Sequence, residues 1–283
     1  MNDLFNKETF CQGEDISSLL PLDHLTLFDD IDSTNTELLR RLSMSKGSLC
    51  GSDGKLTEEG LYFNKMTLAS ASQSRGKGRL GRIFFSPLSG LYFSYVYVPV
   101  DGIVDPSFYT IATSVAVCRA IDKLFSCKTD IKWVNDIYYK GKKICGILAE
   151  GFINPEINKL ESLVVGIGIN ISFSNNIPIE LRDKVGGIAD LTGVKEVSRV
   201  ELLKECLKNI MSILDNGENI INEYQSRSFL TGKSVNVSPV INEKAGDYKA
   251  IVLEIDENGH LIVQKEDGSV ENLSFGEVSL HCN

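Results

Sequence analysis

A ten-residue segment combines cations and glycines in a pattern typical of a phosphate site. Segment 73–82 reads QSRGKGRLGR, with Arg75, Lys77, Arg79 and Arg82 spaced among three glycines. Glycine lets backbone N–H groups approach a ligand closely, and Arg and Lys bind phosphate oxygens through charge-assisted hydrogen bonds. A nucleotide triphosphate or an adenylate fits this chemistry. For this segment alone, a solvated basic turn is the alternative.

The same segment satisfies the spacing G-x-G-x-x-G between Gly76 and Gly81. A dinucleotide-binding loop of that spacing follows a strand and opens a helix. Here the next residues predict a strand, so the sequence argues against a dinucleotide-binding fold.

A second group of polar residues lies in two neighbouring segments, KWVND at 132–136 and KKICGIL at 142–148. Asn135 and Asp136 place an amide and a carboxylate at a predicted strand end, and Lys143 begins the next strand across a tight turn. Taken separately, an aspartate is a common turn former and a lysine a common solvated charge. Their combination holds a lysine near an Asn–Asp pair and favours a functional site.

The composition excludes several classes of protein. A net charge of -9 provides no broad basic surface for a nucleic acid. Seven cysteines and three scattered histidines show neither a disulfide framework nor zinc-ligand spacing. No stretch approaches the roughly 18 apolar residues of a membrane helix. We therefore expect a cytoplasmic protein that binds neither DNA nor a membrane.

The elements that must position these residues follow from periodicity and turn signals. Thr34-x-x-Glu37 predicts a capping box, so Ser33, Thr34 and Asn35 should lie at a strand-to-helix junction. We interpret Ser43 to Glu59 as a surface loop. The predicted strands are 24–28, 66–70, 83–85, 91–98, 131–134, 144–150 and 162–171, and the long helices are 106–125 and 199–224.

Beyond Gly232 the pattern changes to short strands broken by glycine turns. We therefore predict an α+β fold, in which a mixed β-sheet with helices is followed by a small β-barrel. The predicted domains are 1–229, which would bind the ligands, and 230–283.

Five motifs occur together in a specific order: DSTN at 32–35, Gln73 with GKGRLGR, KWVND, KKICGIL, and VGIGIN at 165–170. In this order the sequence resembles the biotin protein ligases, closely from Leu25 to Asn170 and more loosely beyond. The resemblance implies the catalytic fold shared by class II aminoacyl-tRNA synthetases and biotin ligases, with a C-terminal SH3-like barrel.

The resemblance also implies roles for individual residues. Those expected to bind biotin are Ser33, Thr34, Asn35, Gln73, Lys77, Gly78, Arg79, Lys143 and Gly146. Those expected to bind the nucleotide are Arg79, Arg82, Asn135, Lys143 and Asn170. Those expected to act in catalysis are Lys143, Arg79 and Asp136.

The implied activity is formation of biotinyl-5'-AMP from biotin and ATP, with Mg²⁺, followed by transfer of biotin to a lysine. The implied acceptor is a biotin carboxyl carrier protein or domain of a biotin-dependent carboxylase. Bifunctional members add an N-terminal DNA-binding domain, and because the first family strand begins near Leu25 we expect the monofunctional form. The oligomeric state stays open, with a homodimer among the alternatives.

Two other functions are weighed against this one. A lipoate-type protein ligase shares the adenylate chemistry but would need a different glycine-rich signature. A non-catalytic biotin-binding regulator would lack Lys143, Asp136 or the loop cations. Departures from the family pattern leave the adenine contacts open; they are Val134 for proline, Cys145 for alanine, VGGI at Val185 to Ile188, and His281 for arginine.

Overall fold

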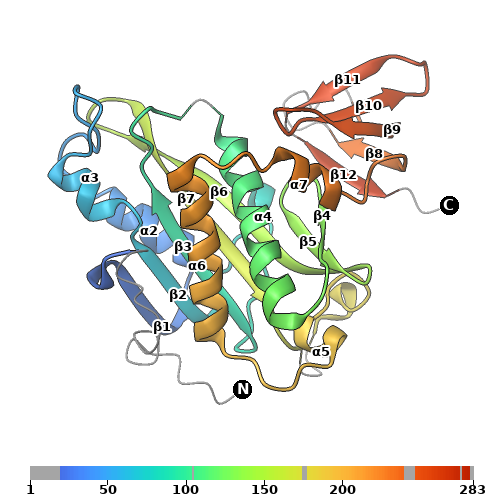
Figure 1. Ribbon diagram of the computed structural model, residues 1–283, viewed down its shortest axis with the longest axis horizontal. Helices are drawn as coiled ribbons and strands as arrows, with labels where there is room; N and C mark the ends of the chain where they lie inside the picture. Colours follow the sequence, from blue (N-terminus) through green and yellow to red (C-terminus); the bar gives the residue numbers. More distant parts are fainter. Residues whose placement is uncertain (1–19, 104, 174–176, 239–245, 275, 281–283) are drawn as a thin grey trace.

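A computed structural model describes residues 20–103, 105–173, 177–238, 246–274 and 276–280 (Figure 1). The larger of its two sheets has seven strands in the order β1-β2-β3-β7-β6-β5-β4. Only the β1–β2 pair is parallel among the described strands of this sheet. The strands are β1 Leu25–Ile31, β2 Thr67–Gln73, β3 Gly90–Tyr97, β4 Asp130–Lys132, β5 Asp136–Tyr139, β6 Lys142–Asn154 and β7 Lys159–Asn170.

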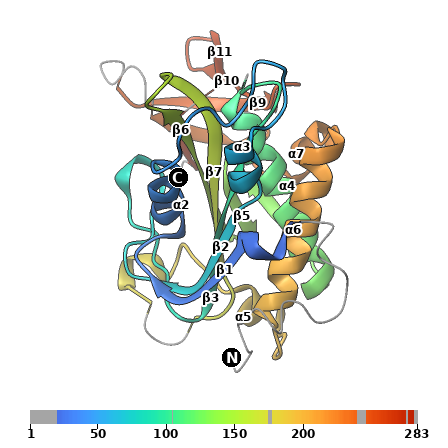
Figure 2. The ribbon, with the colours of Figure 1, turned by 90° about the vertical axis from the view of Figure 1, so that its left-hand side faces the viewer.

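Helices cover both faces of this sheet (Figure 2). Helices α4 (Pro106–Phe125) and α6 (Arg199–Asn216) pack on one face and bury the larger apolar cluster. Helix α2 (Thr34–Leu42) packs on the opposite face, where Leu38 and Leu42 are fully buried. The other α-helices in the described residues of this part are shorter, namely α3 Glu58–Phe63, α5 Ile188–Thr192 and α7 Ile221–Arg227. The predicted α+β class is therefore confirmed.

The start of α2 differs from the predicted capping box. Ser33, rather than Thr34, is the N-cap, and its side chain accepts a hydrogen bond from the Thr36 N–H at 3.4 Å. Glu37 does not reach back to the cap, because its carboxylate pairs with Arg40 and with Arg41. Thr34 consequently lies one residue inside the helix, where its hydroxyl is free of capping and faces the sheet.

Two predicted elements are wrong in detail. Residues 83–85 form no strand, because their backbone follows a turn that includes a short 3₁₀ helix at Arg79–Gly81. The predicted helix 199–224 is two helices, since Gly217 adopts a φ of 61° at the end of α6 and α7 begins only at Ile221. Glycine adopts this left-handed conformation without steric cost.

Strand β5 was not predicted, but the tight turn that follows it and precedes Lys143 was. Lys140 and Gly141 both have positive φ, as a two-residue hairpin turn of the primed type requires. That turn joins β5 to β6, and β5 also pairs with β4 on its other side. The hairpin therefore brings Asp136 and Lys143 to adjacent strands.

The predicted loop Ser43 to Glu59 is more ordered than a surface loop. Leu49 within it is fully buried, and its N–H donates to the buried Glu161 carboxylate. Asn154 donates to the other oxygen of that carboxylate at 2.7 Å. The segment is thus fixed against the β6–β7 hairpin.

The second sheet is antiparallel, with the order β11-β10-β9-β8-β12. It fits the predicted small C-terminal barrel, and it contacts the larger sheet where the Trp133 indole N–H donates to the Gly259 carbonyl at 2.9 Å. His281 lies outside the described residues. No helix in the described part of the chain is long and apolar enough to cross a membrane. The strands are β8 Ser234–Ser238, β9 Tyr248–Ile255, β10 Leu261–Lys265, β11 Val270–Leu273 and β12 Glu277–Leu280.

Candidate active site

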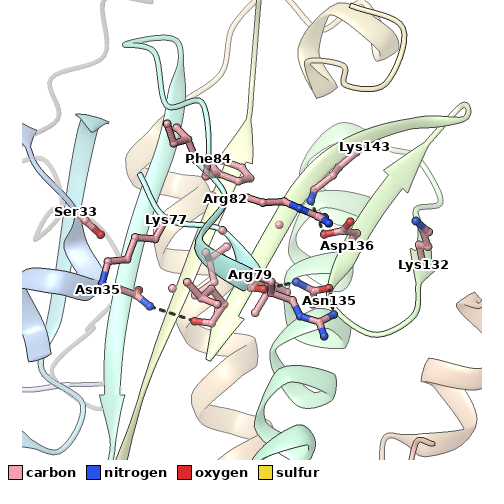
Figure 3. Close-up of a pocket in the computed structure, with 18 of the residues that line it drawn as sticks. Ser33, Asn35, Lys77, Arg79, Arg82, Phe84, Lys132, Asn135, Asp136 and Lys143 are labelled. Atoms are coloured by element: carbon pink, nitrogen blue, oxygen red, sulfur yellow. Dashed lines mark hydrogen bonds and ion pairs between the residues drawn. The ribbon is translucent and has the colours of Figure 1, made fainter. Parts of the chain in front are cut away.

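One cavity of about 420 Å³ collects most of the predicted site residues. Its walls come from the start of α2, the glycine-rich segment, strands β5 to β7 and the C-terminal sheet. In Figure 3, Ser33, Asn35 and Lys77 lie at one end, and Lys143 and Asp136 lie toward the other. The predicted residues that line it are Ser33, Thr34, Asn35, Gln73, Lys77, Gly78, Arg79, Arg82, Asn135, Asp136, Lys143 and Gly146.

At the α2 end, the Gln73 amide is held in one orientation. Its oxygen accepts from the Thr34 N–H at 2.9 Å, and its nitrogen donates to the Ser86 hydroxyl at 3.0 Å. A backbone N–H can only donate, so the amide oxygen must face Thr34. The second N–H of Gln73 therefore stays available to a ligand oxygen.

Lys143 and Asp136 form an ion pair at the opposite end. Lys143 Nζ lies 2.5 Å from Asp136 Oδ1 and 5.9 Å from the centre of the Phe84 ring. The two charged side chains are only 25% and 20% exposed, which limits screening by water. A carboxylate thus holds the lysine ammonium in place within the cavity.

The neighbouring Lys142 points away from this cavity. Its Nζ donates to the carbonyl of Asp183 at 2.7 Å on the outer side of β6. Successive strand residues alternate between the two faces of a sheet. Lys143 is therefore the lysine that faces the cavity.

The glycine-rich segment bridges the two sheets. One guanidinium nitrogen of Arg79 donates to Asn135 Oδ1 at 3.3 Å, and the other donates to the Gly276 carbonyl at 3.0 Å. Lys77 reaches toward the α2 end, where its Nζ lies 3.6 Å from Glu150 Oε1. Both cations are thus placed over the cavity, from opposite sides of one turn.

Sequence reasoning named Gly146 but missed the aromatic ring above it and the paired Gly168. Phe84 packs on both glycines, and an added Cβ at either position would overlap carbons of its ring. Glycine at positions 166 and 168 puts two residues without side chains on one face of β7. That spacing was the signal for a flat groove. Other lining residues that were missed are Ile83, Lys132, Trp133, Ile147, Leu148, Gly166, Ile167, Ser238, Val278 and Ser279.

Asn170 is the one predicted site residue that does not line the cavity. It is 5% exposed, and its Nδ2 lies 3.4 Å from the carbonyl of Lys143. The carbonyl of Lys143 also accepts from the Gly186 N–H at 3.0 Å. In this structure Asn170 and the segment near Val185 thus support the backbone of Lys143.

Cys145, which stands where the family commonly has alanine, is a packed thiol. Burial raises its pKa well above the ordinary value, and the nearby Cys206 and Cys118 act in the same direction. A neutral buried thiol is a poor nucleophile. The chemistry of the cavity must therefore come from its charged side chains and its ligands.

The donors in the cavity fit a magnesium ion that arrives with phosphates. Mg²⁺ usually takes one or two protein carboxylates and completes its shell with water and phosphate oxygens. Asp136 supplies such a carboxylate beside Lys143. Within the described ranges, no group of three or more His, Cys, Asp or Glu could hold a metal by itself. Asp136 is the residue that would hold the ion, which would offset phosphate charge.

Comparisons with known proteins agree with the motifs. Residues 55–170 match the Biotin/lipoate A/B protein ligase family. The Bifunctional ligase/repressor BirA of Bacillus subtilis is 29% identical over 203 residues, which cover 69% of this chain and 60% of that protein. The chain thus spans about 60% of the length of that relative. A biotin--[acetyl-CoA-carboxylase] ligase of Mycobacterium tuberculosis is 25% identical and covers 87% of this chain and 85% of its own length.

Solved structures agree in fold. A biotin protein ligase from Aquifex aeolicus in complex with biotin and ATP has a TM-score of 0.71 and 25% sequence identity. The match covers 92% of this chain and 99% of that one. The motif order, the fold and the match over residues 55–170 agree with the expected resemblance to biotin protein ligases. Over those residues this chain is similar to the biotin/lipoate A/B protein ligase family, and it has the fold of the solved biotin protein ligases.

Proposed function

We propose that this protein is an enzyme, a biotin protein ligase that forms biotinyl-5'-AMP from biotin and ATP and transfers biotin to a lysine. The proposed acceptor is a biotin carboxyl carrier protein or domain. One observation carries the proposal: a single cavity holds an amide with a fixed donor at Gln73 and an ion-paired ammonium at Lys143. The Gln73 amide suits a neutral polar ring, and the Lys143 ammonium suits reacting anions.

The α2 end of the cavity matches the ureido ring of biotin. A cyclic urea presents a carbonyl acceptor beside N–H donors, and small polar side chains can satisfy both. Gln73 offers an N–H, while Ser33 and Thr34 offer hydroxyl oxygens. The apolar ring carbons and valeryl chain would lie along Ile147 and Leu148, which also line the cavity.

The Lys143 end supports the first step. A biotin carboxylate oxygen attacks the α-phosphorus of ATP, the new O–P bond forms, and diphosphate leaves with its bonding electron pair. Carboxylate and phosphate repel one another, so cations that face both lower the barrier. We expect the Lys143 ammonium to leave Asp136 and to bind the oxygens of the carboxylate and the α-phosphate. Arg79 would bind them from the opposite side. Bound Mg²⁺ would add positive charge at the phosphates.

In the second step, the acceptor lysine amine attacks the activated carbonyl. The amide bond forms, AMP leaves, and the amine loses a proton. Water would hydrolyse the same anhydride, so the site must exclude water between the two steps. The glycine-rich segment can close over the ligand, since Leu80 and Ile83 are exposed at its surface and available for burial.

A lipoate-type ligase is the second candidate, because the matched family includes both kinds of enzyme. A dithiolane ring has no N–H or carbonyl group. It would leave the second N–H of Gln73 and a lone pair of the Thr34 hydroxyl without a ligand partner, which costs binding energy. The polar end of the cavity therefore favours biotin. A cytoplasmic location and a homodimer stay predictions.

The first step can be tested without a carrier. Incubation of the purified chain with Mg-ATP and biotin should release diphosphate and form biotinyl-5'-AMP, detected by mass spectrometry. Lipoate in place of biotin should give neither product. Biotin binding without any adenylate would favour the non-catalytic regulator instead.

A further inference from the structure

A chain of hydrogen bonds, partly buried at Glu150 and fully buried at Ser94, runs beneath the α2 end of the cavity. It begins at Glu150 on β6, passes through Asn35 and Ser94, and ends at the Thr34 hydroxyl. Asn35 Nδ2 donates to Glu150 at 2.8 Å, Ser94 Oγ lies 2.6 Å from Asn35 Oδ1, and Thr34 Oγ1 lies 2.6 Å from Ser94 Oγ. Ser94 is fully buried and does not line the cavity.

The direction of each hydrogen bond in this chain is determined by its first member. A carboxylate and a backbone carbonyl can only accept, so the Asn35 nitrogen must face Glu150 and the Leu148 carbonyl, which lies 3.3 Å away. The Asn35 oxygen therefore faces Ser94, and Ser94 must donate its single hydroxyl hydrogen to it. A Cβ at Gly166 would overlap this oxygen, so the glycine allows β7 to cover the amide.

The consequence appears at Thr34. Ser94 donates its hydroxyl hydrogen to Asn35, so in the short contact between the Ser94 and Thr34 hydroxyls the hydrogen must come from Thr34. Among the described residues, the one other acceptor within reach of that hydrogen is Gln73 Oε1, at 3.2 Å, and it also belongs to the protein. Whether the Thr34 hydroxyl donates to Ser94 or to Gln73, it has no hydrogen left for a ligand. It can therefore only accept a hydrogen bond from a ligand.

We propose that Glu150, Asn35 and Ser94 are positioning residues that fix the Thr34 hydroxyl as a hydrogen-bond acceptor, so that the site selects a ligand N–H at this position. The inference rests on the proposed function, because biotin supplies such an N–H from its ureido ring. It goes further by naming three residues that set the selectivity, of which Ser94 and Glu150 do not line the cavity. A ligand oxygen at the same place would face the lone pairs of the Thr34 oxygen with no hydrogen between the two oxygens, so the contact would be repulsive.

The test compares biotin with its two ring-oxygen analogues, in each of which one ureido N–H is replaced by oxygen. Calorimetry should show that the unaltered chain binds one of the two analogues about a hundredfold more weakly than biotin, because two acceptors then face each other. In Ser94→Ala the short contact of the Thr34 hydroxyl is lost, and only the longer one to Gln73 Oε1 remains. Gln73 Oε1 keeps the Thr34 N–H as a donor, so the Thr34 hydroxyl can turn and donate to that analogue. The ratio of the two affinities should then fall to about tenfold or less.

Ser70→Ala is the matched control. Ser70 is also a fully buried serine, on neighbouring strand β2, and it donates to the Ser72 carbonyl at 2.6 Å outside the chain of hydrogen bonds. Its loss should leave the affinity ratio unchanged. An unchanged ratio in a folded Ser94→Ala protein would overturn the inference, while biotin binding by the unaltered chain would still support the proposed function.

A second pair of variants applies if Ser94→Ala does not fold. Thr34→Val keeps the shape of the side chain without its oxygen and should bring the ratio near one, whereas Thr34→Ser should keep it. A ratio retained by Thr34→Val would overturn the inference. Absence of biotin binding by the unaltered chain would overturn the proposed function and this inference together.

Discussion

Two lysines that are adjacent in sequence have opposite surroundings. Lys143 is ion-paired to Asp136 within the cavity, while Lys142 donates to backbone carbonyls on the outer side. The sequence pattern KK predicts this separation only if the segment is a regular strand. The structure shows this separation, although the β5–β6 pairing shifts register beside Lys143, where Ile137 pairs with Cys145 and Tyr138 with Lys143. The two lysines form a matched pair for mutation.

Lys143→Ala should reduce adenylate formation by about 10²-fold or more, because it removes charge that faces the reacting phosphate. Lys143→Arg should restore little activity, since a planar guanidinium cannot replace a compact ammonium between carboxylate and phosphate. Lys142→Ala should retain near-normal activity. Diphosphate release measures all three. Normal activity in Lys143→Ala with loss in Lys142→Ala would show that the wrong lysine has been assigned.

At the scale of single residues, the motifs and the family resemblance named half of the residues that line the cavity. Side-chain type and local spacing pointed to Asp136 and Lys143, the resemblance added Gln73, and all three line the cavity. Ser94 and Glu150 could not be found in this way. Their importance depends on contacts across 59 and 115 residues, which no local pattern contains.

At the scale of elements, helix α4 shows what local sequence can predict. Pro106 at its first turn and Asp105 as its N-cap determine the start, and the observed range matches the predicted one. Residues 83–85 show the opposite case. Their alternating pattern predicts a strand, but Phe84 instead packs on Gly146 and Gly168, so tertiary packing overrides local preference.

The glycine-rich segment is the element that must move during the proposed reaction. It is held by Arg79 at Gly276 and by Lys77 at Glu150, and its Leu80 and Ile83 side chains are exposed. Few buried apolar contacts predict low local stability. Amide hydrogen exchange of residues 75–81 should therefore be fast in the free protein and slower with biotin and ATP. Equal exchange in both states would contradict closure of this segment.

At the scale of the whole molecule, the cavity belongs to both sheets. Ser238, Val278 and Ser279 of the C-terminal sheet line it, although the sequence pattern separated residues 230–283 as a domain of their own. Strand periodicity predicted that sheet but gave no sign of what it contacts. The predicted domain boundary stays a prediction, and the shared cavity means that both parts contribute to one site.

Transfer of biotin to a carrier is the central claim, and a single measurement tests it. The purified chain, Mg-ATP and a biotin carboxyl carrier domain are incubated with biotin or with lipoate, and the mass of the carrier is then determined. We predict one biotinyl group on one lysine with biotin, and an unchanged carrier with lipoate. A lipoylated carrier without biotinylation, or an unmodified carrier beside a folded chain that binds both biotin and ATP, would contradict the account.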